Sequence, residues 1–347
     1  MSSQPVEFKK QVTHSDWYKS LTKFEKSDIR KTSWQLINTL VPYAISWIVM
    51  VLMLNHYHLP YYTIVPVLLV SSGFLVRVFI IFHDCGHGSF YDSKRLNAIT
   101  GYITGVLVFT PYEEWKHAHA VHHATVGDLE RRGSGDIWTM TVEEYLTCSK
   151  WKRLGYRMYR NPLILFVLGP PGLFIIAQRF PTKGSGKMER RSVVITDIAL
   201  AALVGLASIT IGLKTYLLIQ IPLMTLAGIF GVWLFYVQHQ YLEVYWERHQ
   251  KWDPIRAALE GSSYYKLPKV LQWFSGNIGL HHIHHLRPRI PNYNLQQSYD
   301  EVPALRAIEP LTIGRSFRSL FMHLWDENQK KMVSCWSVRN RLKGQAT

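Results

Sequence analysis

The stretch "VRVFIIFHDCGHGSF", residues 76–90, joins two kinds of sequence with opposite solvent preferences. It is almost wholly apolar up to Phe82, as a membrane-spanning helix requires, and it then places His83 and His87 where the apolar run stops. Residues four apart share one face of a helix, so the two imidazoles point the same way. Because ionisable groups at this depth are functional candidates by default, we predict that a membrane helix ends here at a functional site.

Apolar blocks of this kind recur along the 347-residue chain, which is 48% hydrophobic. A helix needs about 20 apolar residues to cross a bilayer. Four blocks are near that length, and they cover residues 36–54, 62–82, 193–213 and 216–237. The sequence therefore predicts an all-α membrane protein with four transmembrane helices.

Two further apolar stretches are ambiguous. Residues 98–109 are short for a span, and residues 162–180 are interrupted by "LGPPG". We interpret both as re-entrant or interfacial segments, which are tolerated where protein covers the backbone. The alternative is that both cross the membrane, which gives six spans.

Basic residues predict the orientation, because short cytosolic segments are enriched in Lys and Arg. The N-terminal segment 1–35 and the loop "PTKGSGKMERR" at 181–191 are both basic, so we expect both in the cytosol. We expect one domain, 1–347, in the cell membrane with its active site on the cytoplasmic side. Its parts would be a first helix hairpin at 36–82, a cytosolic region with re-entrant segments at 83–192, a second hairpin at 193–237 and a cytosolic helical cap at 238–347.

The formal net charge is +15, but no nucleic-acid motif accompanies it, so we do not expect nucleic acid as a partner. In a membrane protein such an excess more often marks cytosolic loops and contact with anionic lipid. The three scattered cysteines argue against a disulfide framework and fit a reducing, cytosol-facing location.

The 16 histidines are concentrated in three boxes, "HDCGH", "HAHAVHH" and "HHIHH". Within each box the spacing is three or four residues, which places the imidazoles on one helix face. The candidate metal ligands of the boxes are His83, His87, His119, His122, His123, His281, His284 and His285.

We expect one of the other histidines to be a metal ligand and exclude the rest. His239, in "FYVQHQ", ends another predicted span and is an additional candidate ligand. His117 and His282 point away from their box partners, so we exclude them. The remaining histidines are expected to be ordinary residues, and they are His14, His56, His58, His249 and His323.

Eight or nine imidazoles exceed the ligands of one ion, so the count suggests two metals. Zinc usually takes four ligands, and the HExxH pattern is absent. Imidazole suits iron, copper, zinc and nickel alike. Carboxylate-bridged di-iron proteins use paired Glu-x-x-His motifs, and we find one, from Glu114 to His117. A histidine-rich di-iron site fits the pattern better.

The motifs "HDCGH", "WKHAHAVHH" and "GNIGLHHIHH", followed by "RIPNYNL", resemble the three histidine boxes of membrane fatty acid desaturases. The resemblance covers residues 82–295, and "VQHQ" is similar to the family's extra histidine site. "GSGDIW" and "EGSSYYKLPK" look most similar to the bacterial acyl-lipid desaturases, in particular the phospholipid delta-5 type.

The resemblance implies the chemistry. Two iron ions, cycling between Fe2+ and Fe3+, would use O2 as co-substrate to remove two hydrogens from adjacent CH2 groups of a membrane phospholipid acyl chain, which leaves a cis double bond. The eight box histidines would be the catalytic set, with His239 as a further ligand. The acyl chain supplies two electrons and a donor two more. No HPGG haem signature is present, so ferredoxin or flavodoxin is the expected donor.

Supporting residues can also be proposed. Neutral imidazole ligands need a partner on their other nitrogen, and the candidate partners are Asp84, Asp136, Asn277 and Asp300. The aromatic residues that could line an acyl channel, or alternatively anchor the protein at the membrane interface, are Trp115, Trp138, Tyr241 and Trp273.

Three other readings make distinct predictions. A fatty acyl hydroxylase would use the same scaffold and differ only in product. A histidine-lined metal transporter requires ionisable residues within the spans, where Arg77 and Asp197 are the main candidates. A transmembrane haem protein requires histidines that face each other deep in the membrane. The sequence leaves open the double-bond position, the headgroup and chain-length preference, the donor and the oligomeric state.

Overall fold

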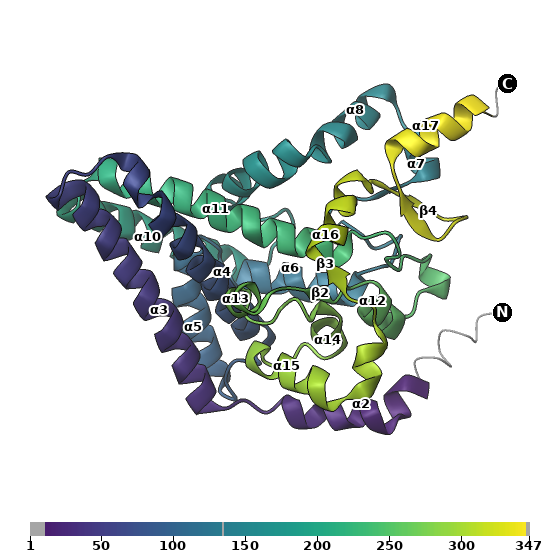
Figure 1. Ribbon diagram of the computed structural model, residues 1–347, viewed down its shortest axis with the longest axis horizontal. Coiled ribbons are helices and arrows are strands. Elements are labelled where there is room, and N and C mark those ends of the chain that lie inside the picture. The colour runs from purple at the N-terminus through teal and green to yellow at the C-terminus, as the bar shows by residue number, and fades with distance from the viewer. Residues whose placement is uncertain (1–10, 134, 345–347) are drawn as a thin grey trace.

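The computed structural model describes residues 11–133 and 135–344, so parts of the predicted N-terminal segment and cap, 1–10 and 345–347, lie outside the described residues. Long helices gather at one end and a cap of short helices and strands forms the other (Figure 1). The first and last labelled helices, α2 (Asp16–Ser20) and α17 (Cys335–Gly344), both lie on the side of the cap (Figure 1).

Among the described residues, four helices are long and apolar enough to cross a membrane, which confirms the predicted number of spans. The first is α3 (Ile29–Val51) with its continuation η2 (Leu52–His56), and the second is η3 (Tyr61–Ile64) with α4 (Val65–His87). The others are α10 (Lys187–Thr210) and α11 (Leu213–His239). Even the shortest span, with 24 residues, is about 36 Å long at 1.5 Å per residue, against about 30 Å of hydrocarbon.

The four spans form two hairpins whose turns meet. Asn55 Nδ2 donates a hydrogen bond to the carbonyl of Ile211 over 2.7 Å, and Tyr61 Oη donates to the carbonyl of Leu218 over 3.0 Å. Because the turns lie together at one end, the C-terminal ends of α4 and α11 lie together at the other end. The hairpins therefore deliver His83, His87 and His239 to the same side of the bundle.

Helix α4 is the central span. Its most apolar window is 56% buried within the protein, compared with 22% for the first and third spans and 33% for the fourth. Leu75, Ile81 and Phe82 are almost completely buried in the core that α4 forms with α3 and α11. The helix that carries the first histidine box is thus also the one that protein surrounds best.

Neither ambiguous stretch forms a straight span. Helix α5 (Lys94–Leu107) has 14 residues, about 21 Å, and is too short to cross. Residues 163–179 form the irregular turns η4 (Leu163–Leu168), α9 (Gly169–Pro171), η5 (Gly172–Ile176) and η6 (Ala177–Arg179). With α8 (Lys150–Tyr159) they make a pair bent by 61°, either a broken span or a re-entrant loop. By length and composition, the part of the chain that the structure describes therefore offers at most five spans, and the six-span alternative is not supported.

The remaining elements are short. The helices are α2 (Asp16–Ser20), η1 (Leu21–Phe24), α6 (Tyr112–Thr125), α7 (Val142–Thr147), η7 (His249–Lys251), α12 (Pro254–Glu260), α13 (Lys269–Phe274), α14 (His281–Leu286), α15 (Asn292–Glu301), η8 (Pro303–Ala307), α16 (Ile313–Ser316), η9 (Phe317–Phe321) and α17 (Cys335–Gly344). Strand β4 (Leu324–Asp326) pairs in parallel with β1 (Met140–Thr141) and antiparallel with β5 (Lys331–Val333). Strand β2 (Tyr265–Lys266) pairs in parallel with β3 (Leu311–Thr312).

Candidate metal centre

The first histidine box occupies the last turn of α4. Gly88, with φ of +67°, follows as the left-handed residue that ends the helix. His83 and His87 therefore stay within the regular helix, one turn apart, and their ring centroids lie 4.7 Å from each other. Helix α4 ends at His87, at the point where the sequence places two imidazoles after the apolar run, as predicted.

The second box lies on α6, which runs beside the end of α4. Tyr112, in the first turn of α6, donates a hydrogen bond from its hydroxyl to the carbonyl of Cys85 over 2.7 Å. Trp115 stacks on His119 at 4.3 Å between ring centroids and packs edge-on against His83 at 5.7 Å. These contacts hold the face of α6 that carries the second box against the first box.

The third box forms almost all of α14, a six-residue helix in which every side chain is buried. A backbone hydrogen bond of 2.7 Å from Tyr265 N–H to the Gly279 carbonyl fixes the segment just before it. His282 turns away from the other box histidines and packs against Tyr264 and Tyr299. His282 therefore points away from the other histidines of its box, as predicted. His117 is exposed, and its Nδ1 lies 3.9 Å from Glu189 Oε1 rather than beside the other box histidines.

The three boxes and His239 converge. One ligand atom from each of five histidines falls within 4.8 Å of all the others, and this first group is His83, His87, His119, His123 and His284. A second group, formed in the same way, is His122, His239 and His285. His281 joins the second group, because its Nε2 lies 2.9 Å from that of His239 and 3.1 Å from that of His285.

The two groups are adjacent but distinct. The rings of His123, from the first group, and His285, from the second, stack at 4.0 Å with an interplanar angle of 15°. Each of the second and third boxes contributes to both groups, whereas the first box contributes only to the first group. The arrangement offers five imidazoles on one side and four on the other.

The nitrogen spacing within each group suits a metal ion. Two nitrogen ligands about 2.1 Å from one ion and at right angles lie about 3.0 Å apart. The Nε2 atoms of His119 and His123 are 3.1 Å apart, as are those of His123 and His284, and those of His122 and His239 are 3.3 Å apart. His87 Nε2 is buried and has no hydrogen-bond partner among the described residues. Each group could therefore hold one ion.

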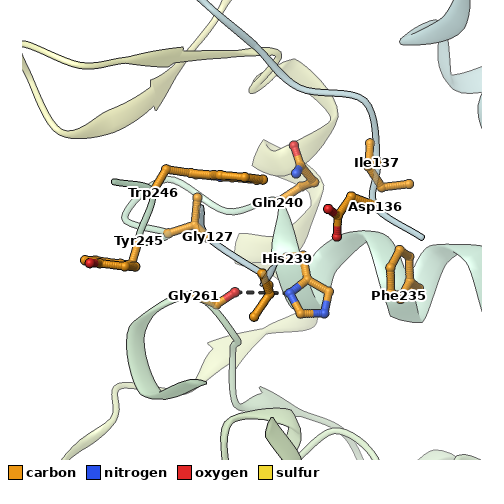
Figure 2. Close-up of a pocket in the computed structure, with 11 residues that line it drawn as sticks. Gly127, Asp136, Ile137, Phe235, His239, Gln240, Tyr245, Trp246 and Gly261 are labelled. Atoms are coloured by element: carbon orange, nitrogen blue, oxygen red, sulfur yellow. Dashed lines mark hydrogen bonds between the residues drawn. The ribbon is translucent and has the colours of Figure 1, made fainter. Parts of the chain in front are cut away.

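Three imidazoles receive support on Nδ1. The His83 Nδ1 atom lies 3.1 Å from Asp84 Oδ1, and the His122 Nδ1 atom lies 2.5 Å from Asp136 Oδ1. His239 Nδ1 lies 3.1 Å from the carbonyl of Gly261, in a small pocket that Asp136 also lines (Figure 2). Such partners fix the tautomer, so that Nε2 is left free to bind a metal.

The partner predictions are thus confirmed for Asp84 and Asp136 and wrong for two other residues. Asn277 donates to the carbonyl of Asn292 rather than to an imidazole, and Asp300 is exposed and accepts from Gln296. The sequence reading also missed the Gly261 carbonyl, because any residue type can supply a backbone acceptor.

Burial favours the uncharged form of five histidines of the cluster. It lowers the pKa well below the ordinary imidazole value for His119, His123, His281, His284 and His285, and neighbouring imidazoles lower it further. A metal ligand must be the neutral imidazole, so these side chains are ready to bind at neutral pH.

The other predicted aromatic residues lie elsewhere. Trp138 packs against Tyr156 and Tyr159, and Tyr241 donates to the carbonyl of Glu260. Trp273 lies under the guanidinium of Arg77 at 4.1 Å. Of the four candidates, Trp115 is the one in ring contact with the cluster, and a channel role for any of them stays a prediction.

The ionisable candidates within the spans, buried Arg77 and partly exposed Asp197, have protein partners. Arg77 donates to Thr39 Oγ1 over 3.0 Å and to the carbonyl of Trp273. Asp197 pairs with Arg179 over 2.6 Å.

The nine clustered histidines lie at one end of the bundle rather than along it, which does not match the transporter or the transmembrane haem hypothesis. The fold and the site thus define the class of the protein. It is an all-α membrane protein whose spans end at a buried cluster of histidines.

Comparison with known proteins gives the family. The fatty acid desaturase family model matches residues 57–313. A fatty acid desaturase of Bacillus subtilis is 42% identical over 341 residues, which cover 98% of this chain and 95% of that protein. The sn-1 acyl-lipid omega-3 desaturase (ferredoxin) of Synechocystis sp. is 27% identical, over 80% of this chain and 75% of its own length. An endoplasmic reticulum omega-3 fatty acid desaturase of Vigna radiata is 31% identical, over 64% and 60% respectively.

The chain belongs to the fatty acid desaturase family, and family membership makes it an oxidoreductase.

Proposed function

We propose that the protein is a membrane acyl-lipid desaturase that introduces a cis double bond into phospholipid acyl chains by O2-dependent di-iron chemistry. The observation that carries this proposal is the convergence of nine imidazoles into two adjacent groups at the end of the spans. Family membership supports the reaction class.

The residues present fit a pair of iron ions. His83, His87, His119, His123 and His284 would hold one ion, and His122, His239, His281 and His285 the other. Two bound irons supply the capacity to reduce O2 and to remove hydrogens from an unactivated CH2 pair. Neutral imidazoles suit iron, and no carboxylate is needed to complete either group.

The chain's own residues position and shield the reacting region. The cluster lies where α4 and α11 end, at His87 and His239, so we expect an acyl chain anchored in the bilayer to approach it from the membrane side. Trp115 covers His119 and His83 with an apolar ring, which excludes water from one side of the cluster. Asp84, Asp136 and the Gly261 carbonyl orient three of the imidazoles.

We assign the cluster to the cytoplasmic side of the cell membrane. Support comes from the positive-inside rule, because the basic N-terminal segment and the basic loop before α10 lie at the cluster end of the spans. An acidic donor such as ferredoxin or flavodoxin would meet a chain of net charge +15, which favours association by charge complementarity. The name of the Synechocystis relative specifies ferredoxin for that protein.

The delta-5 position is the part of the proposal that rests on "GSGDIW" and "EGSSYYKLPK" alone. Product analysis decides it. The protein would be expressed in a host that lacks desaturase activity, and the double bonds of the extracted phospholipids would be located by mass spectrometry. We expect new cis double bonds at delta-5, absent in a His284→Ala variant. A hydroxylated product, or product that persists in His284→Ala, would contradict the proposal.

A further inference from the structure

Asn292, in the "RIPNYNL" segment after the third box, contacts the residue that supports His83. Its backbone N–H and its side-chain Nδ2 both donate to Asp84 Oδ2, over 2.7 Å and 2.8 Å. The other carboxylate oxygen, Asp84 Oδ1, faces His83 Nδ1 at 3.1 Å. Asp84 and Asn292 are each 1% exposed. One buried carboxylate is therefore shared between an imidazole and a single asparagine.

The double contact determines how Asp84 can be oriented. A carboxylate without such donors could rotate about its terminal torsion, which has broad minima. With two donors converging on Oδ2, the plane of the group is fixed and Oδ1 is directed at His83. An acceptor held on Nδ1 keeps the proton there and leaves Nε2 free.

Asn292 is itself held by two other parts of the chain. Gln35, on α3, donates from Nε2 to Asn292 Oδ1 over 2.9 Å. Asn277 donates from Nδ2 to the carbonyl of Asn292 over 3.2 Å. Gly276, with φ of +53°, brings its backbone so close that a Cβ there would lie 3.2 Å from Asn292 Oδ1 and 2.8 Å from Ile80 Cγ2. The first span and the turn before the third box thus fix the asparagine.

We propose that Asn292 is a positioning residue for the first histidine group, acting on His83 through Asp84; this inference rests on the proposed function. Among the described residues, the second group has no equivalent double contact, because the distal oxygen of Asp136 accepts one longer bond, of 3.3 Å, from the Gly133 N–H. Loss of the Asn292 side chain should therefore weaken one metal ion and spare the other.

Asn294 provides a matched control within the same segment. Its Nδ2 donates to the carbonyls of Phe24 and Lys26, over 3.0 Å and 3.4 Å, and its Oδ1 accepts from Lys31. It ties the cap to the N-terminal segment without touching Asp84. A merely structural role for the segment would make Asn292→Ala and Asn294→Ala behave alike.

The experiment uses full-length protein in lipid nanodiscs, depleted of iron and titrated anaerobically with Fe2+, with iron Mössbauer spectroscopy of the loaded sample. We expect Asn292→Ala to weaken one of the two bound ions about 10- to 100-fold, and to alter the Mössbauer signal of that ion alone. Asn294→Ala should keep both affinities and both signals. Asp84→Asn, which preserves side-chain shape, should weaken the same ion even if Asn292→Ala does not fold.

The double variant completes the test. Adding Asn292→Ala to Asp84→Asn should weaken the ion little further, because both changes act through one imidazole. Wild-type affinities in Asn292→Ala, or equal losses in Asn292→Ala and Asn294→Ala, would overturn the positioning role while leaving the proposed function standing. A folded wild-type protein that binds no iron would overturn both.

Discussion

Gly105 gives a quantitative test of how the first and second histidine boxes are held together. It lies in α5, and its carbonyl accepts a 2.8 Å hydrogen bond from the N–H of Thr110. A Cβ at this position would lie 2.6 Å from the Thr110 carbonyl oxygen and 3.1 Å from Phe82 Cε2. Thr110 is followed by Pro111, the residue that caps α6, so a shift here moves the helix that carries the second box.

The magnitude follows from these distances. Carbon–oxygen contacts are seldom closer than about 3.3 Å, so Gly105→Ala requires a shift of about 0.7 Å. Functional constellations tolerate about 0.5 Å. Overpacking of this kind costs about 1–3 kcal/mol, whereas a glycine-to-alanine change inside a helix normally stabilises by about 0.5–1 kcal/mol. The net cost is then about 0–2.5 kcal/mol, so we expect Gly105→Ala to lower the unfolding temperature by up to about 4 °C and to reduce iron affinity.

The control is Gly205→Ala in α10, where a Cβ would have nothing within 4 Å among the described residues. The same substitution should there leave stability equal or slightly higher, with iron binding unchanged. Thermal unfolding in detergent and an Fe2+ titration measure both variants. A Gly105→Ala protein as stable as Gly205→Ala, with wild-type iron affinity, would refute the packing argument.

Three further predictions concern single residues. His119→Ala should abolish new double bonds, whereas His117→Ala, at an exposed position, should give wild-type amounts of product by lipid analysis. Arg179→Ala leaves Asp197 without its 2.6 Å partner and should lower the unfolding free energy by about 1–3 kcal/mol; wild-type stability would show that the pair contributes nothing. Burial lowers the pKa of His323 to about 4 in the folded protein, whereas an unfolded histidine has a pKa of about 6.5. As the pH falls, the unfolded state therefore binds a proton at His323 before the folded state does. Because of this residue, the unfolding free energy should fall by about 1.4 kcal/mol per pH unit between pH 6.5 and pH 4. If the unfolding free energy of a His323→Leu variant fell with pH as steeply as that of the wild type, this prediction would be contradicted.

The spans and the histidine boxes could be predicted because their signals are local. Run length identifies a membrane helix, and spacings of three and four residues place His119, His122 and His123 on one face whatever surrounds them. The same reasoning could not divide the nine histidines into two groups. His122 and His123 are neighbours in sequence but belong to different groups, and that division depends on where α4, α11 and α14 cross α6.

Residue type alone also could not separate the true supporting residues from the false ones. Asp84 and Asp300 carry the same side chain, yet Asp84 meets His83 and Asp300 is exposed on α15. The partner of Asp84 lies 208 residues further along the chain, at Asn292. Such a contact is set by tertiary packing, and a single sequence carries no local signal for it.

Metal analysis of the purified protein is the most direct test of the central claim that nine imidazoles hold two irons. Protein isolated from cells supplied with iron would be assayed for iron, zinc and copper per chain, alongside variants that each remove one member of a group, His87→Ala and His239→Ala. We predict close to two irons per wild-type chain, with each variant losing one ion more readily than the other. A folded, active wild-type protein with one iron or fewer, or variants that retain both ions at wild-type affinity, would contradict it.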